Sequence, residues 1–119
     1  MTVLVVEDDF VISEVLCELL TAEGHDVIAA GNGQEGLEAF DRCNPSLVVS
    51  DVMMPKLDGR EMVRQLRARP QGRRVPIIVI SAARALGQEE FGQDLFIEKP
   101  FDFDVFLDHV RALSTRQAG

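Results

Sequence analysis

Three carboxylates of this chain stand at the ends of short apolar runs that are rich in β-branched residues. Glu7 and Asp8 follow the run Val3–Val6, and Asp51 closes the run that begins at Leu47. If both runs are parallel strands that end side by side, their acids share one small pocket, where like charges repel one another. Such a cluster persists only when a proton, a lysine or a metal ion compensates the negative charge.

Lys99 supplies a cation for this pocket, because it also closes a strand-like apolar run. One ammonium group leaves the cluster with excess negative charge. Mg2+ is a hard cation that binds carboxylate oxygens together with a few waters. The pattern therefore predicts a Mg2+ site bounded by Glu7, Asp8 and Asp51.

Strand-like and helix-like patterns alternate along the whole chain. Strands are expected over residues 3–6, 27–30, 47–50, 76–80 and 95–97. Helices are expected over 9–23, after Gly33, over 60–69, weakly over 84–91, and over 103–113, the last burying Phe103, Phe106, Leu107, Val110 and Leu113. Strands joined by helices predict an α/β fold with a parallel sheet and right-handed crossovers. Ligands of such sheets bind beyond the carboxyl ends of the strands, where the acids and Lys99 fall.

Composition narrows the possible functions. A chain of 119 residues forms one domain. Its net charge of -8 argues against direct binding to nucleic acid, which requires a basic surface. No apolar stretch approaches the roughly 18 residues of a membrane-spanning helix, so we expect a cytoplasmic protein without membrane contact. Cys17 and Cys43 are expected to be small buried thiols, and His25 and His109 to be surface residues.

Two further features have structural interpretations. Asp9 precedes the first helical pattern, and we expect it to cap that helix by accepting a hydrogen bond from an exposed backbone N–H. Arg60, Arg64 and Arg67 share one face of the third helix. We expect them to form ion pairs with nearby acids, and a docking patch for an acidic partner is the alternative.

Taken together, four motifs resemble the receiver domain of two-component response regulators, the CheY-like superfamily. They are Val5-Val6-Glu7-Asp8, the segment 51–59, Ser81-Ala82 and the segment 96–101. The resemblance covers essentially the whole chain. It implies a flavodoxin-like, doubly wound (βα)5 sheet with strand order 2-1-3-4-5, residues 1–116 as the bacterial receiver domain and 117–119 as a tail.

This resemblance assigns roles to the acids. Asp51 would accept a phosphoryl group from the phosphohistidine of a sensor histidine kinase or a histidine phosphotransfer protein. Asp8, Asp51 and the backbone carbonyl of Met53 would hold Mg2+, with Glu7 acting through water. The acyl phosphate on Asp51 is a mixed anhydride, which stores enough free energy to drive a conformational change.

The remaining motif residues would act on the phosphoryl group and on the switch. By the same resemblance, Ser81 bonds a phosphoryl oxygen, Lys99 pairs with the Asp51 site, and Phe96 holds the aromatic switch position. The peptide Lys99–Pro100 is cis in that family. A shift of Ser81 would open space for Phe96 to rotate, which is a local packing switch that controls a downstream protein.

Four other functions are compatible with parts of this pattern. A phosphorelay shuttle shares all the site residues, so the motifs leave it open. A small aspartyl phosphatase needs a second acid two residues after its nucleophile, where this chain has Met53. A flavin module needs a phosphate-binding loop where this chain has Glu7-Asp8-Asp9. A degenerate scaffold is disfavoured because the core positions are intact. We therefore expect no enzymatic activity beyond self-phosphorylation and self-dephosphorylation.

The interval between Ser81 and Lys99 is the main departure from the family. It is shorter than usual by about one helical turn, and the missing length falls in the fourth helix. We therefore expect a short or irregular fourth helix, and no activated dimer through the face that this helix forms with its neighbours. Met1 lies directly before the first strand, which favours a stand-alone receiver over an excised piece of a longer protein.

Overall fold

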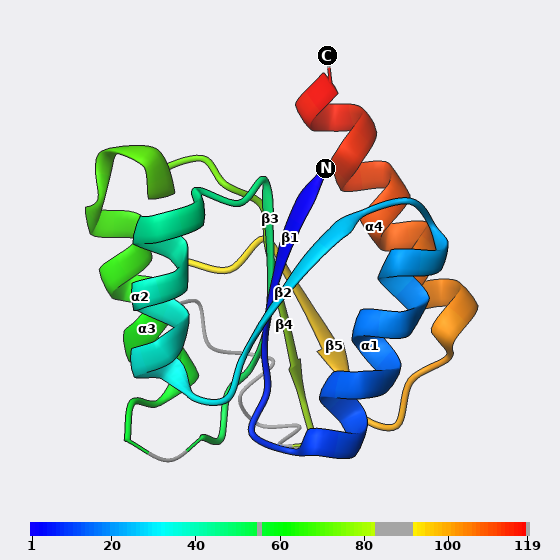
Figure 1. The fold of residues 1–119 in the computed structure, drawn as a ribbon, viewed down its shortest axis with the longest axis horizontal. Helices are drawn as coiled ribbons and strands as arrows, with labels where there is room; N and C mark the ends of the chain where they lie inside the picture. The colour runs from blue at the N-terminus through cyan, green and yellow to red at the C-terminus, as the bar shows by residue number, and fades with distance from the viewer. Residues whose placement is uncertain (55, 83–91, 119) are drawn as a thin grey trace.

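A single parallel sheet forms the centre of the molecule (Figure 1). The structure is a computed structural model, and it describes residues 1–54, 56–82 and 92–118. The strands are β1 (Thr2–Val6), β2 (Asp26–Ala30), β3 (Leu47–Asp51), β4 (Ile77–Ser81) and β5 (Leu95–Glu98). They pair in the order β2-β1-β3-β4-β5, and all of the pairs are parallel. The predicted α/β class and strand order are confirmed.

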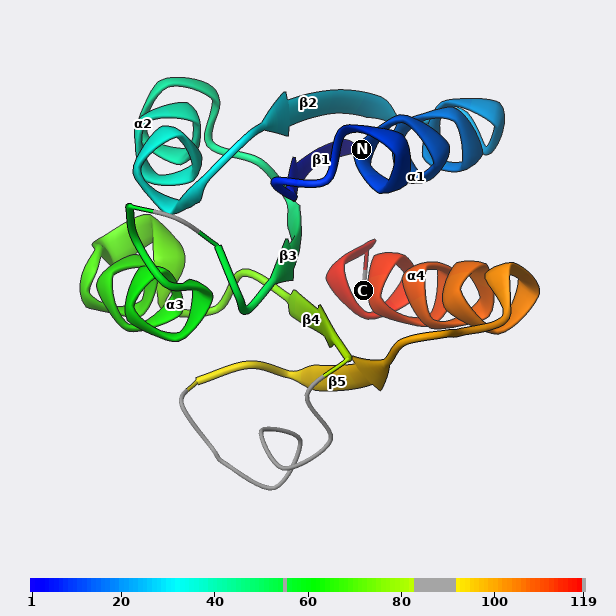
Figure 2. The same ribbon diagram turned by 90° about the horizontal axis from the view of Figure 1, so that it is seen from below.

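Helices cover both faces of this sheet. They are α1 (Phe10–Ala22), α2 (Gly33–Cys43), α3 (Gly59–Ala68), the short 3-10 helix η1 (Pro70–Gly72) and α4 (Phe103–Ala118). Figure 2 shows α2 and α3 on one face and α1 and α4 on the other. The helix α4 is the predicted last helix, and it continues to Ala118, two residues into the predicted tail. The predicted weak helix over 84–91 lies outside the described residues, so its length and the expected lack of a dimer remain predictions.

Alternate residues of each strand enter opposite cores, as expected for a sheet that is covered on both faces. Leu4 and Val6 of β1 join the core beneath α2 and α3. Val3 and Val5 join the core beneath α1 and α4. The last helix buries four of its five predicted core residues, but Phe103 is 47% exposed. That prediction was wrong because Phe103 is the first residue of α4, where it packs edge-on against Phe101.

The helix ends follow the predicted capping chemistry. The Asp9 carboxylate accepts hydrogen bonds from the backbone N–H groups of Val11 and Ile12 at 3.0 and 3.2 Å, so the predicted cap is confirmed. The helix α2 begins at Gly33 itself, one residue earlier than expected. Asn32 caps it by accepting a hydrogen bond from the Glu35 N–H at 2.9 Å.

The predicted arginine face forms ion pairs, as expected. Arg60 pairs with Asp58 at 3.2 Å, Arg64 with Glu61 at 3.3 Å, and Arg67 with Asp94 at 2.9 Å. These contacts confirm the predicted ion pairs of the third helix, although the Arg67 side chain is only 21% exposed.

The cysteines and histidines all have intermediate burial. Cys17 and Cys43 are free thiols that are half-buried rather than buried, and burial raises the pKa of the Cys17 thiol. His25 and His109 are half-buried, so each keeps part of its side chain at the surface, as expected. Among the described helices, none combines the length and the apolar character needed to cross a bilayer.

Candidate functional site

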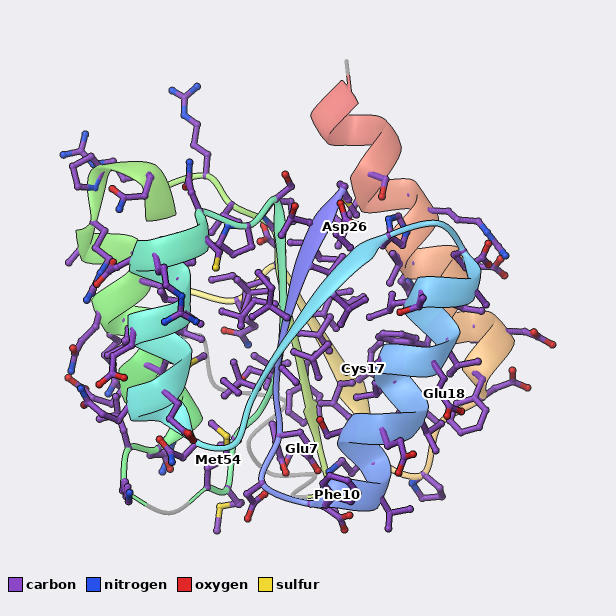
Figure 3. All side chains as sticks on the ribbon, viewed as in Figure 1. Glu7, Phe10, Cys17, Glu18, Asp26 and Met54 are labelled. Carbon is purple, nitrogen blue, oxygen red and sulfur yellow. The ribbon has the colours of Figure 1, made fainter. Side chains whose placement is uncertain are left out.

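The predicted site residues gather at the carboxyl edge of the sheet. Asp51 and Ser81 are the last residues of β3 and β4, while Glu7 and Lys99 directly follow β1 and β5. The parallel register sets Asp51 beside Ile80 and Ser81 beside Glu98. These side chains therefore lie along one edge, and Figure 3 shows Glu7 at the end of the sheet opposite Asp26.

Lys99 connects the two buried acids. Its Nζ lies 3.2 Å from Glu7 Oε1 and 3.2 Å from Asp51 Oδ2. The exposed fractions are 3% for the Glu7 side chain, 10% for Asp51 and 19% for Lys99. Such a group of charges is costly to remove from water, so close pairing is what makes it tolerable in the folded protein.

Burial and charge shift the pKa values of this group. Burial raises the pKa of Glu7 to about 8, with further contributions from a hydrogen bond to Asp51 and from the Asp51 charge, while Lys99 opposes the shift. Burial by itself lowers the pKa of Lys99, but the carboxylates of Glu7 and Asp51 outweigh it, and the net pKa is raised. Without a metal ion, Glu7 therefore holds a proton near neutral pH while Lys99 stays charged.

The acids fit a hard divalent cation. Glu7, Asp8 and Asp51 each offer a carboxylate oxygen, and these oxygens lie within 4.8 Å of one another. Glu7 and Asp51 are buried whereas Asp8 is exposed, so the cluster is open to solvent on the Asp8 side. Met53, whose carbonyl is predicted to bind Mg2+ together with Asp8 and Asp51, follows Asp51 by two residues and is exposed.

Backbone hydrogen bonds orient Asp51. The Val52 N–H donates to Asp51 Oδ1 at 2.7 Å, which leaves Oδ2 toward Lys99. The Val52 carbonyl accepts from the Gly59 N–H at 2.8 Å, so the same residue also holds the start of α3. Ser50 Oγ donates to the Asp51 carbonyl at 2.7 Å. The carboxylate is thus held by the local backbone as well as by Lys99.

The two predicted switch residues lie on neighbouring strands. Ser81 is buried at the end of β4, and its carbonyl accepts from the Lys99 N–H at 2.9 Å. Phe96 of β5 lies beside Val79 of β4, and its partly buried ring packs against the core beneath α2 and α3. The peptide Lys99–Pro100 is cis, as the resemblance implied. The switch roles of Ser81 and Phe96 remain predictions.

An apolar groove that none of the sequence motifs indicated lies next to the site. It has a volume of about 380 Å³. Its walls come from α1, from Ala82 after β4, and from the segment between Lys99 and the start of α4. The lining residues are Val11, Ile12, Val15, Leu16, Ala82, Lys99, Pro100, Phe101 and Phe103. Of these lining residues, Val11 is 67% exposed, and Phe10, which precedes it in the chain, is 77% exposed. The available signal was that Phe10 and Val11 directly follow the capping Asp9 and fall outside the inward stripe of that helix.

The comparisons with known proteins agree with this geometry. The family described as "Response regulator receiver domain" matches residues 3–111. "Response regulator MprA" of Mycobacterium leprae (strain TN) is 38% identical over 120 residues, which cover 98% of this chain and 52% of that protein. The chain therefore spans about half the length of the curated relatives that it matches.

Solved structures of similar proteins share the fold. The Francisella response regulator 1452 receiver domain superposes with a TM-score of 0.89 at 31% identity, covering 98% of each chain. The response regulator TrrA from Thermotoga maritima, solved in complex with Mg2+–BeF, superposes with a TM-score of 0.87 at 32% identity, covering 94% of this chain and 97% of that one.

Proposed function

The chain belongs to the family of response regulator receiver domains of two-component signalling, and we propose that its Asp51 accepts a phosphoryl group in a Mg2+-dependent reaction. One observation carries this proposal. Lys99 Nζ lies 3.2 Å from a carboxylate oxygen of Asp51, at the mouth of the only group of three acids with metal-ligand spacing in the described residues. A carboxylate nucleophile with an adjacent ammonium and a cation site is what acyl-phosphate formation requires.

In the proposed reaction, an oxygen of Asp51 attacks the phosphorus of a phosphohistidine on a sensor histidine kinase or a histidine phosphotransfer protein. The P–O bond to Asp51 forms as the P–N bond breaks, and the imidazole nitrogen keeps the bonding electron pair. Lys99 neutralises charge on the phosphoryl oxygens. Ser81 offers a hydroxyl donor to one of those oxygens once the group is attached.

The metal fits the carboxylates of this edge. Asp8, Asp51 and the Met53 carbonyl would hold Mg2+, with Glu7 contributing through water. When bound, Mg2+ supplies positive charge that neutralises the transferring phosphoryl group. The complex of the related TrrA with Mg2+–BeF supports this choice of ion.

The apolar groove suits the phosphodonor protein. Exposed apolar surface next to a charged site is typical of a protein contact. Here the exposed side chains of Val11 and Phe103 line the groove beside Lys99. A donor helix seated there would bring its phosphohistidine to Asp51. We propose that phosphorylation then moves Ser81 and Phe96 and so controls a downstream protein, with no catalysis on other substrates.

The test is the mass of the intact protein after incubation with acetyl phosphate and Mg2+. We expect one phosphoryl adduct on the wild type, and none on Asp51→Asn or in the presence of EDTA. An adduct on Asp51→Asn would place the acceptor elsewhere. A wild type that gains no adduct would refute the proposal.

A further inference from the structure

Two glycines approach the connection between β3 and α3 more closely than any other residue could. A Cβ atom on Gly33 would lie 2.3 Å from the Leu57 carbonyl oxygen and 2.9 Å from Leu57 Cβ. A Cβ on Gly59 would lie 2.3 Å from the Asp51 carbonyl oxygen and 2.8 Å from Val52 Cα. Real Cβ atoms essentially never approach other atoms this closely, and the opposing atoms are mostly backbone, so an added methyl group must displace the connection itself.

Neither glycine is explained by its backbone conformation or by helix propensity. The glycines with positive φ in the described residues are Gly24 and Gly92, whereas Gly33 and Gly59 are the first residues of α2 and α3. Glycine is a poor helix former and is not among the leading choices at a helix start. The lack of a side chain at both positions is therefore explained by the space that the connection occupies.

The atoms that these glycines touch belong to the framework of the site. Val52 donates its N–H to Asp51 Oδ1 at 2.7 Å and accepts through its carbonyl from the Gly59 N–H at 2.8 Å. Leu57 lies at the other end of the connection, directly before Asp58, which caps α3. Gly33 thus contacts the end of the connection at Leu57, and Gly59 contacts its beginning at Val52. Met53 lies between these two contacted residues in the sequence.

We propose that Gly33 and Gly59 are positioning residues for the phosphorylation site. Their missing side chains let α2 and α3 close against the connection, which sets the Asp51 carboxylate and the Met53 carbonyl in place for Mg2+. This inference rests on the proposed function, because it assigns to these two glycines the geometry of the same Mg2+ site. Loss of a hydrogen-bond partner of a metal ligand typically changes metal affinity by about 10–100-fold, and the Val52 N–H is such a partner of Asp51.

Gly36 provides a matched control within the same helix. A Cβ on Gly36 would lie 2.8 Å from Met62 Sδ and 3.0 Å from Val6 Cγ2, which are side-chain atoms of the core. Gly36→Ala therefore crowds α2 as Gly33→Ala does, but it presses on side chains of the core and not on the connection. A purely structural role for Gly33 predicts the same behaviour for both variants.

The experiment compares Gly33→Ala, Gly59→Ala and Gly36→Ala with the wild type in two NMR measurements. The first is the Val52 amide shift without metal, which reports its hydrogen bond to Asp51. The second is a titration with MgCl2 alone. We expect Gly33→Ala and Gly59→Ala to move the Val52 signal and to weaken Mg2+ binding by about tenfold or more. Gly36→Ala should leave the Val52 signal in place and the affinity within about twofold of the wild type. A variant that is unfolded in buffer is measured in trimethylamine N-oxide, which favours the folded state.

The outcomes separate this inference from the proposed function. Wild-type affinity and an unmoved Val52 signal in Gly33→Ala and Gly59→Ala would overturn the inference alone. An equal loss of affinity in Gly36→Ala would also overturn it, because general crowding would then suffice. A wild type that binds no Mg2+ would overturn the proposed function, and the inference with it.

Discussion

Replacing Lys99 by methionine removes the one ammonium group that contacts both buried acids while it keeps a long, unbranched side chain. Lys99 Nζ lies 3.2 Å from Glu7 Oε1 and from Asp51 Oδ2. Because Glu7 holds a proton near neutral pH, the contact with Asp51 is the charge pair; at an effective dielectric constant of about 20 it is an attraction of about 5 kcal/mol before the cost of desolvation is subtracted. Desolvation of the two charged groups offsets most of this attraction.

The expected net effects differ between stability and phosphorylation. Removing one partner of a buried pair costs about 3–5 kcal/mol when the remaining charge stays unpaired. Here Glu7 already holds a proton at pH 7, because its pKa is about 8, so Asp51 is the one charge left without Lys99, and it keeps its hydrogen bond from the Val52 N–H. We therefore expect Lys99→Met to lower the free energy of unfolding at pH 7 by only about 1–3 kcal/mol. Loss of one group that stabilises developing charge slows phosphoryl transfer by about 10²–10³-fold.

Binding of Mg2+ distinguishes this mechanism from simple damage to the site. The ammonium of Lys99 competes with the metal for oxygens of Glu7 and Asp51. Lys99→Met should therefore bind Mg2+ more tightly than the wild type, although it is phosphorylated more slowly. The rate is measured from intact mass over time with acetyl phosphate, and the affinity from an NMR titration with MgCl2.

Arg73→Met is the charge-matched control, because Arg73 is exposed and precedes β4 at the opposite edge of the sheet. It should keep both the wild-type rate and the wild-type Mg2+ affinity. The reasoning is refuted if Lys99→Met is phosphorylated within about threefold of the wild-type rate, or if it binds Mg2+ more weakly than the wild type does.

Three further predictions concern stability. Without Mg2+, the raised pKa of Glu7 means that the folded state binds more protons than the unfolded state between pH 4.5 and about 8, so the free energy of unfolding should fall as pH rises through this range. In urea titrations of Glu7→Gln, this dependence on pH should be lost. An unchanged dependence on pH would contradict the raised pKa of Glu7. Phe106→Ala should lower the free energy of unfolding by about 3–5 kcal/mol, because Phe106 is fully buried. The neighbouring Val105 is half-exposed, so Val105→Ala should change the free energy of unfolding by less than about 0.5 kcal/mol in the same urea titration. Lys56→Gly should raise the melting temperature, since Lys56 has φ of 66° and glycine relieves about 1 kcal/mol of backbone strain there; a lower melting temperature would show that Lys56 makes a compensating contact.

The strands and the acids of the site were predictable because their signals are local. Short β-branched runs such as 47–50 and 77–80 indicate buried parallel strands, and Asp51 and Ser81 directly follow these runs in the sequence. Once the sheet is parallel, its topology brings those ends together without further information. The cap by Asp9 was equally local, because its partners Val11 and Ile12 are close neighbours in the chain.

The exposure of Phe103 and the apolar groove could not be predicted, because both depend on contacts between segments that are distant in the sequence. Phe103 fits a helical stripe, but it is the first residue of α4, and its ring stays half-exposed beside Phe101. The groove required α1 and the segment before α4 to meet beside Lys99, although they are far apart in the sequence.

The alternating strand and helix patterns were enough to predict the fold class and the carboxylates that gather at one edge of the sheet, and the family resemblance added the strand order. The raised pKa of Glu7 follows only from packing, since it depends on the burial of Glu7 and on its distance from Asp51 and Lys99. The close approach of Gly33 to Leu57 has the same origin, because the space between two backbones is set by how helices pack and not by any pattern within one helix.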